Sequence, residues 1–264
     1  MTAPVLLIGA GRMGGALLRG WSKKNLSVVA VEPNLQPHLR KLKGVSVVGS
    51  VEQAKGKFRA CVIALKPQIF RNEAVTLRPI AASGALMISI AAGMTIKSMK
   101  QAWGSKARIV RAMPNTPGAI GHGISALFAG PNVTDRDKAL AQSLLAALGE
   151  TLWVKKESLI DTVTAVSGSG PAYVFLMVEA LAAAARAEGL PADIATRLAR
   201  ATVAGAGALL DADPTRAAEL RRHVTSPHGT TEAALKVLMA KNGLAALMRR
   251  AVSAARKRAA ELGA

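Results

Sequence analysis

The stretch PVLLIGAGRMGG, residues 4–15, decides the fold class of this chain. An apolar run typical of a buried strand leads directly into a G-x-G-x-x-G array, and helix-forming residues follow. In this context the first glycine permits a tight turn, the second lets a pyrophosphate approach the backbone, and the third allows close packing of the helix on the strand. The helix N-terminus adds unpaired N–H groups that bind anions. We therefore predict a dinucleotide-binding loop whose contacts come from Gly9, Ala10, Gly11, Arg12, Met13 and Gly14.

Apolar and β-branched runs recur after this loop and alternate with helical stretches. Strands are predicted at 4–8, 28–32, 45–48, 60–65, 85–90, 107–111 and 123–128, and helices at 12–24, 68–78, 95–103 and 135–148. Such alternation is typical of a doubly wound parallel sheet. From about residue 157 the pattern is helical only, with breaks at Asp213-Pro214 and Asn242-Gly243. We predict an α/β Rossmann-type domain over residues 1–156 and an all-α domain over residues 157–264.

The composition bounds the possible partners. Of 264 residues, 35 are Lys or Arg and 16 are Asp or Glu, so the net charge is +19. Such an excess occurs in proteins that bind nucleic acids or anionic small molecules. The basic residues are scattered, however, and aromatic residues make up only 3% of the chain, so we expect no nucleic acid partner. Glu179 and Arg186 interrupt the most apolar helix, and no signal peptide is evident, so we expect no membrane span and a cytoplasmic protein.

Thiol and metal chemistry are not indicated. Cys61 is the single cysteine and lies in the apolar run 60–65, so we expect a buried thiol. The four histidines show no metal-ligand spacing, and no metal is expected.

Glu32 stands at the end of the second predicted strand, downstream of the glycine-rich loop. An acidic side chain at this place usually accepts hydrogen bonds from the adenosine ribose and repels a 2′-phosphate. It therefore favours NADH over NADPH. His38, Arg40 and Lys41 follow closely and could attract a phosphate, so NADPH remains an alternative.

Further cofactor contacts are expected from loops that follow predicted strands, because ligands of doubly wound sheets bind at the carboxyl ends of the strands. The relevant stretches are ALKPQ (64–68), AAGMT (91–95) and MPNTPG (113–118). The Lys-Pro pair in the first of these could equally form an ordinary turn. The residues predicted to line the cofactor are Ala64, Lys66, Pro67, Ala92, Gly93 and Asn115.

Two later stretches, SGSGP (167–171) and TSPHGTT (225–231), are each predicted to open a helix, at 172–188 and 232–241. Hydroxyl groups and free N–H groups at such starts suit a carboxylate. Ordinary N-capping explains one hydroxyl at each start, but not the glycine-rich backbone of both. We predict that they bind a small carboxylate substrate through Ser167, Gly168, Ser169, Gly170, Ser226, Pro227, His228, Gly229, Thr230 and Thr231.

Six stretches, in register along the chain, closely resemble the pyrroline-5-carboxylate reductase family: GAGRMG, ALKPQ, SIAAGMT, RAMPNTP, VSGSGPAYVF and SPHGTT. The resemblance implies NAD(P)H-dependent reduction of 1-pyrroline-5-carboxylate to L-proline, the final step of proline biosynthesis. It also implies a Rossmann-type domain joined to an all-α dimerisation domain, in a homodimer that often assembles into a larger ring. By the same resemblance, Thr231 lies near the imine nitrogen as the catalytic hydroxyl, the SGSGP and SPHGTT loops hold the carboxylate, and Lys66 and Asn115 line the nicotinamide side.

Two features depart from the family pattern. His228 replaces a glycine, which is costly if that position needs a positive φ, and its imidazole could carry a positive charge at mildly acidic pH. Residues 214–219 are slightly longer than the usual connection. The alternatives are a related reductase of a 3-hydroxy acid or of another cyclic imine, and a basic scaffold that kept a dinucleotide fold. Hydroxy-acid enzymes of this fold need a lysine on an early helix of the second domain, and 172–188 carries none.

Overall fold

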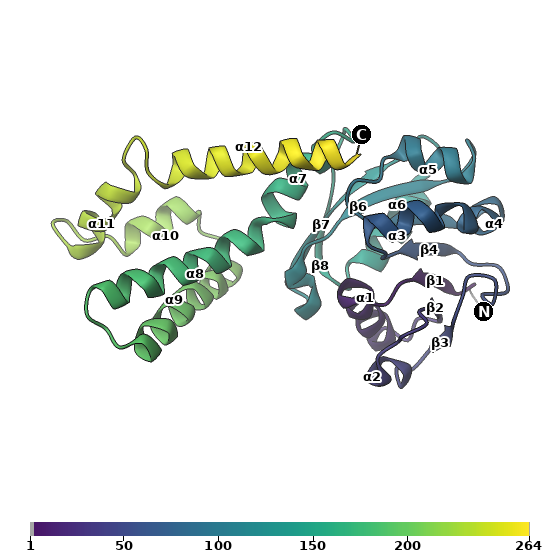
Figure 1. Ribbon diagram of the computed structural model, residues 1–264, viewed down its shortest axis with the longest axis horizontal. Helices are drawn as coiled ribbons and strands as arrows, with labels where there is room; N and C mark the ends of the chain where they lie inside the picture. Colours follow the sequence, from purple (N-terminus) through teal and green to yellow (C-terminus); the bar gives the residue numbers. More distant parts are fainter. Residues whose placement is uncertain (1–2, 264) are drawn as a thin grey trace. The chain divides into compact units, whose positions relative to one another are not determined.

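The computed structural model describes residues 3–263 and divides the chain into two compact units (Figure 1). The first comprises Met1–Ser169 with Ala255–Ala264, and the second comprises Gly170–Ala254. The outermost residues of the two predicted domains, 1–2 and 264, lie outside the described residues.

An eight-stranded sheet forms the centre of the first unit, in the order β3-β2-β1-β4-β5-β6-β7-β8. All seven predicted strands are present, and an eighth, β8, had not been predicted. Their bounds are β1 Val5–Ile8, β2 Val28–Val31, β3 Val45–Val48, β4 Ala60–Ile63, β5 Leu86–Ser89, β6 Ile109–Met113, β7 Gly123–Ala129 and β8 Gly149–Trp153.

The sheet is parallel as predicted except at one place, where β7 runs antiparallel to β6. A parallel neighbour needs a crossover connection of roughly a dozen residues or more. The connection between β6 and β7 is only residues 114–122, which form a short 3₁₀ helix, Thr116–Ile120, and a turn at Gly121. The chain therefore doubles back directly. β8 then pairs with β7 in parallel, and the remaining neighbours are parallel as predicted.

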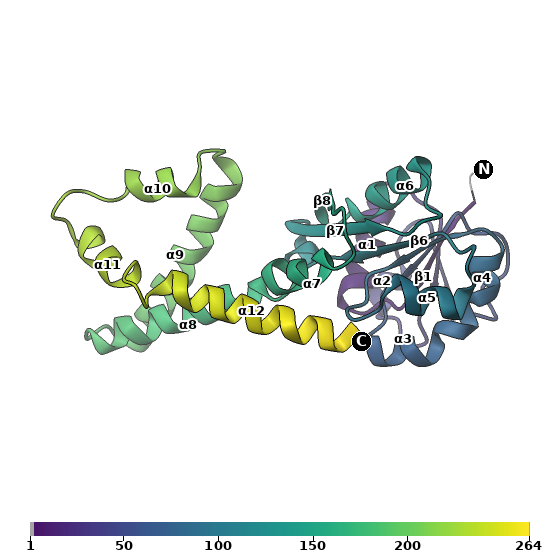
Figure 2. The same ribbon diagram turned by 90° about the horizontal axis from the view of Figure 1, so that it is seen from above.

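Helices cover both faces of the sheet (Figure 2). Alternate residues of β1 point to opposite faces, so Leu7 packs with Trp21 and Leu144 on one side and Leu6 packs with Phe70 and Trp103 on the other. The helices of this unit are α1 Arg12–Lys23, α2 Pro37–Arg40, α3 Pro67–Glu73, α4 Arg78–Ala82, α5 Ile96–Trp103, α6 Asp135–Leu145 and α7 Leu159–Val163.

The reversal at β7 determines where the chain leaves the sheet. β7 begins at the edge where β6 ends, and β8, with Gly149 opposite Gly123, begins at that same edge. β8 therefore ends at the opposite edge of the sheet. The chain that follows it runs back toward the carboxyl ends of the parallel strands. A Cβ atom on Gly168 would lie 3.7 Å from the Met113 sulfur, at the end of β6. Residues 164–169 thus reach the edge at which dinucleotides bind in this fold.

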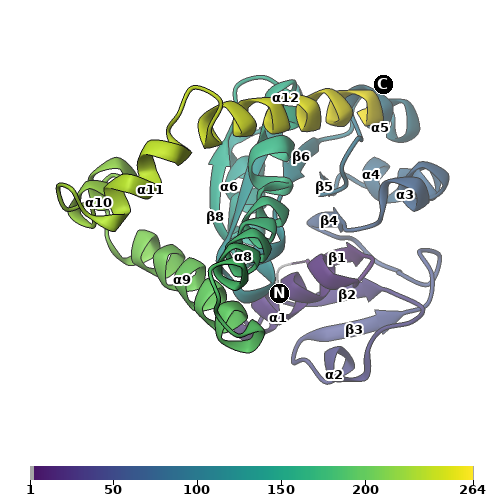
Figure 3. The same cartoon turned by 60° about the vertical axis from the view of Figure 1, so that its left-hand side comes forward.

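The second unit is helical throughout. Its helices are α8 Gly170–Ala187, α9 Ala192–Ala212, α10 Ala217–His223, α11 Thr230–Leu238 and the first part of α12 Leu244–Gly263. The helices predicted at 172–188 and 232–241 are present with shifted ends. α8 and α9 lie side by side, joined by a short turn (Figure 3). Within this unit only Ala182, Ala195 and Ala199 are buried hydrophobic residues, and large apolar side chains are exposed along α8 and α9.

By length and apolar composition alone, the helical stretch Leu159–Ala187 could also cross a membrane. Glu179 and Arg186 lie within it. An extended apolar surface of this kind marks a contact with another protein or with lipid.

Candidate active site

Each glycine of the G-x-G-x-x-G loop meets a different constraint. Gly9 has a φ of +86°, and a Cβ atom on Gly14 would overlap the carbonyl oxygen of Gly9. Both positions therefore require glycine for the fold itself. Around Gly11, the N-cap residue of α1, no atom other than those of Gly11 and its two chain neighbours lies within 4 Å of the place where a Cβ would stand. This opening lies over the first turn of α1, which contains Arg12 and Met13 and has N–H groups without intrahelical partners. The loop therefore fits a dinucleotide pyrophosphate.

Glu32 lies against this loop. One of its carboxylate oxygens accepts a hydrogen bond from the backbone N–H of Ala10 at 2.9 Å, and the other accepts from Asn34 N–H at 3.2 Å. The exposed side chains of His38 and Arg40 follow in α2. The structure thus brings the predicted ribose-binding residue to the glycine-rich loop, with the alternative phosphate-binding residues nearby in the chain.

The loops after β4 and β5 come next to the glycine-rich loop along the sheet, because β4 pairs with β1 and β5 pairs with β4. Ala64 donates its N–H to the carbonyl of Ile8, and its own carbonyl oxygen would be 2.9 Å from a Cβ on Gly9. Lys66 is the exposed N-cap residue of α3, and Pro67 is the first helical residue. The Lys-Pro pair thus forms a helix start rather than an isolated turn.

The loop that contains Ala92 and Gly93 is tightly constrained. Gly93 has a φ of +68°, and a Cβ atom there would lie 2.7 Å from the carbonyl oxygen of Leu262, near the end of α12. That carbonyl also accepts a hydrogen bond from the Arg71 guanidinium at 2.5 Å. Thr95 then forms a capping box with Ser98 at the start of α5. The AAGMT stretch is therefore a rigid turn at the carboxyl end of β5.

Asn115 follows β6 and fastens the turn into β7. Its side-chain oxygen accepts a hydrogen bond from Ile124 N–H at 2.9 Å, and its carbonyl accepts from Gly118 N–H. The bond from Ile124 fixes the orientation of the carboxamide, and its NH₂ group is therefore held in one direction.

The predicted helix start at SGSGP is wrong, because the chain is already helical there. α7 continues through a π-helical turn, Thr164–Gly168, into α8. The N–H of Ser169 donates to the carbonyl of Thr164 at 2.8 Å, and the Ser167 hydroxyl donates to Val163 at 3.1 Å. The two glycines resemble a break in the sequence, but they instead permit a widened helical turn. Such π-turns within α-helices are frequent at functional sites.

The SPHGTT stretch does open a helix, as predicted. α11 begins at Thr230, two positions before the expected start, with Gly229 as its N-cap and Thr231 in its first turn. His228 has a φ of +58°, which confirms that this position needs the backbone conformation that glycine adopts without strain. Its N–H donates to the Glu232 carboxylate at 2.8 Å. The half-buried Thr231 and the exposed Ser226 thus flank a helix N-terminus.

The predicted site residues fall into two groups. Ser226 to Thr231 and Gly170 belong to the second unit, and all the others belong to the first. In the first unit the predicted residues lie after β1, β2, β4, β5 and β6 or in the segment that follows α7, and in the second unit they lie at the starts of α8 and α11.

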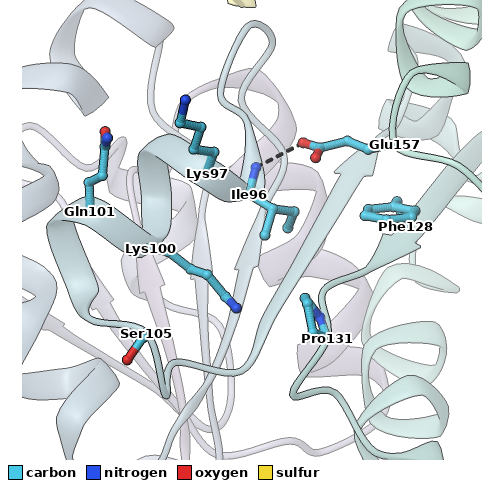
Figure 4. A pocket seen from close by; sticks show the side chains of 8 residues that line it. All are labelled: Ile96, Lys97, Lys100, Gln101, Ser105, Phe128, Pro131 and Glu157. Carbon is cyan, nitrogen blue, oxygen red and sulfur yellow. Dashed lines mark hydrogen bonds between the residues drawn. The ribbon is translucent and has the colours of Figure 1, made fainter.

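Sequence reasoning missed one charged residue near the predicted site residues of the first unit, Arg111 on β6. Its side chain is 3% exposed and forms ion pairs with Glu157, at 3.1 Å, and Asp161, at 3.3 Å. Glu157 also accepts a hydrogen bond from Ile96 N–H at 2.8 Å, and it lines an open groove of about 640 Å³ with Lys97, Lys100 and Phe128 (Figure 4). An arginine inside the apolar run ARIVRAM was the signal that could have revealed this cluster.

Metal and thiol chemistry find no support among residues 3–263. No group of three His, Cys, Asp or Glu side chains in that range could hold a metal ion. Burial raises the pKa of the Cys61 thiol, so the reactive thiolate is disfavoured.

Two family models match the chain. Residues 157–262 match the family described as pyrroline-5-carboxylate reductase dimerisation, and residues 4–93 match NADP oxidoreductase, coenzyme F420-dependent.

Similar proteins cover the chain from end to end. The pyrroline-5-carboxylate reductase of Pseudomonas aeruginosa is 39% identical, over 99% of this chain and 97% of its own length, and that of Pisum sativum is 35% identical, over 97% and 94%. Among solved structures, a pyrroline-5-carboxylate reductase from Coxiella burnetii matches with a TM-score of 0.92 at 35% identity, covering 100% of both chains. The pyrroline carboxylate reductase of Plasmodium falciparum, with NADP bound, matches with a TM-score of 0.83 at 28% identity, over 100% of this chain and 99% of that one. This chain belongs to the pyrroline-5-carboxylate reductase family.

Proposed function

We propose that this protein reduces the C=N bond of 1-pyrroline-5-carboxylate to give L-proline, the final step of proline biosynthesis, with NAD(P)H as the reductant. The observation that carries the proposal is the 39% identity, over 99% of the chain, to a reductase of that name. The glycine-rich loop supports it independently, because the space at Gly11 and the open first turn of α1 fit a dinucleotide.

The cofactor would lie along the carboxyl ends of the parallel strands. When bound there, NAD(P)H supplies the hydride that reduces the imine carbon. The first turn of α1 would hold the pyrophosphate, and Glu32 would accept hydrogen bonds from the adenosine ribose. The remaining contacts are proposed for Ala64, Lys66, Pro67, Ala92, Gly93 and Asn115.

The substrate carboxylate would be held by polar groups of two segments. The free N–H groups in the first turn of α11, with the hydroxyls of Ser226 and Thr230, form an anion site. The π-turn contributes Ser167, Gly168 and Ser169. A protonated cyclic imine accepts hydride readily, so the protein has mainly to orient it. The Thr231 hydroxyl would hydrogen-bond the imine nitrogen and donate or relay its proton.

The first test follows the oxidation of NADH and of NADPH in the presence of 1-pyrroline-5-carboxylate. Thr231→Ala should lower kcat by about a hundredfold, because a positioned proton donor is lost, and should leave cofactor affinity unchanged. Thr225→Ala is the matched control, because that hydroxyl donates to the carbonyl of Arg221 outside the proposed site. Absence of turnover in the folded, cofactor-binding wild type would contradict the function; normal turnover of Thr231→Ala would contradict only the role of that hydroxyl.

Cofactor choice is a separate proposal. The position of the Glu32 carboxylate against the glycine-rich loop supports a preference for NADH, since a negative charge there repels a 2′-phosphate. Glu32→Ser should raise the ratio of kcat/KM for NADPH to that for NADH by about tenfold, or about 1.4 kcal/mol. A ratio that stays constant would remove Glu32 from the specificity site.

The assembly is proposed from the helical segment. Residues 157–264 would form the dimerisation domain and residues 1–156 the dinucleotide-binding domain. The match of 157–262 to a dimerisation family and the exposed apolar side chains of α8 support a homodimer. We propose that dimers associate further into a ring, in the cytoplasm, without a nucleic acid or membrane partner.

A further inference from the structure

We infer that Arg111 is a positioning residue for the substrate: through Asp161 and Glu157 it holds the helical segment that presents Ser167, Gly168 and Ser169. The inference rests on the proposed role of these three residues in holding the substrate carboxylate. Arg111 itself lies inside the sheet and does not contact the substrate.

Arg111 carries a charge on a buried strand, where burying an apolar side chain would cost less free energy. β6 is buried along its whole length, and the guanidinium is almost completely removed from solvent. Its Nε has no hydrogen-bond partner among the described residues. A buried ion pair is often no more stabilising than an apolar replacement of similar volume. Global stability therefore explains the presence of this arginine poorly. The geometry of its ion pairs explains it better.

The two carboxylates that Arg111 binds lie at the start of α7. Asp161 is in the first turn of that helix, and Glu157 precedes it. Glu157 also accepts the N–H of Ile96, at the start of α5, directly after the AAGMT turn. A single guanidinium thus ties together β6, the start of α5 and the start of α7.

The same face of β6 also supports the far end of this helical segment. Met113 lies two residues beyond Arg111, so both side chains point to one face of the sheet. Met113 packs in a buried cluster with Ile160 of α7, and its sulfur is the neighbour that a Cβ on Gly168 would meet. Arg111 therefore sets the angle of the helix at one end, and Met113 supports the π-turn at the other.

Fixing this angle should matter for substrate binding, because a misplacement of about 1 Å in a binding group can cost up to a hundredfold in rate. Arg111→Lys keeps the charge but loses the planar fork that binds two carboxylates, and Asp161→Asn removes one of those carboxylates. For both variants we expect the KM for 1-pyrroline-5-carboxylate to rise about tenfold, while kcat and the KM for NAD(P)H stay within about twofold.

A carboxylate-free substrate separates positioning from general damage. 1-Pyrroline has the same ring and imine but no carboxylate, so its kcat/KM should be the same in both variants as in the wild type. Arg108→Lys is the matched control, because Arg108 forms a similar pair with Asp137, at 2.7 Å, that does not involve α7. It should leave both substrates unaffected.

The outcomes are distinct. A wild type that fails to reduce 1-pyrroline-5-carboxylate would contradict the proposed function. An active wild type with an unchanged KM in both variants would overturn only the role of Arg111. Equal losses on 1-pyrroline and on 1-pyrroline-5-carboxylate would also overturn it, because they report a general structural effect.

Discussion

The roles of single residues near the proposed cofactor and substrate sites could be predicted from the sequence to different extents. The roles of Gly9 and Gly14 could be read from spacing, because a tight turn and a helix–strand contact leave no room for a Cβ atom. The hydrogen bond from Ala10 to Glu32 could not be predicted, since it depends on how close β2 brings the Glu32 side chain to the glycine-rich loop. His228 could be flagged as a departure, but only the backbone shows its φ of +58°.

Two alanine substitutions in the glycine-rich loop should have opposite effects. Gly11→Ala meets no neighbouring atom, so the thermal midpoint should be unchanged, while the new methyl group obstructs the pyrophosphate and weakens NADH binding by about tenfold or more. Gly14→Ala overlaps the Gly9 carbonyl and should destabilise the fold by about 1–3 kcal/mol. Calorimetry and a fluorescence titration with NADH would measure both. Equal loss of stability in the two variants would contradict this assignment.

Strands were predictable here, but their direction was not. Continuous apolar runs such as VLLI and ACVI mark strands that are buried on both faces. The pattern of a strand carries no information on direction, so the reversal at β7 escaped prediction. β8, GETLW, lacks an apolar run because it lies at the edge of the sheet and is only partly buried. The π-turn was misread because Gly-Ser-Gly usually interrupts a helix.

The two serines of the π-turn should differ in their contribution to substrate binding. The Ser167 hydroxyl already donates to the carbonyl of Val163 within the helix. The backbone N–H of Ser169 donates to the carbonyl of Thr164, and we expect its hydroxyl to bind the ligand carboxylate. Ser169→Ala should raise the KM for 1-pyrroline-5-carboxylate about fivefold to tenfold, and Ser167→Ala should raise it by less than about twofold. Steady-state kinetics with equal effects in the two variants would contradict the distinction.

The helical unit leaves many large apolar side chains exposed, so we expect a partner chain to contribute to its stability. Few of its side chains are buried, and Phe175, Leu176 and Leu209 are at least half exposed. The match to a dimerisation family indicates that a second copy of this chain covers these side chains. Where folding and association are linked in this way, stability depends on protein concentration.

A charge on the exposed face of α8 should dissociate the assembly. Phe175 is an apolar side chain, 62% exposed, on this face, and Phe175→Glu would bury a charge in a dimer contact made through it. We expect monomers in sedimentation velocity and a thermal transition that no longer depends on concentration. Val75→Glu is the control, because Val75 is 64% exposed but lies on the sheet unit. A Phe175→Glu protein that remains dimeric would place the contact elsewhere.

The burial of Cys61 has a consequence for how such an enzyme responds to oxidants. The chain has one cysteine, and it is sealed within β4. Subunits therefore cannot be joined through sulfur, and a mild oxidant such as oxidised glutathione finds no accessible thiol. An enzyme that consumes reduced nicotinamide would still respond to the redox state of its surroundings through the supply of that cofactor.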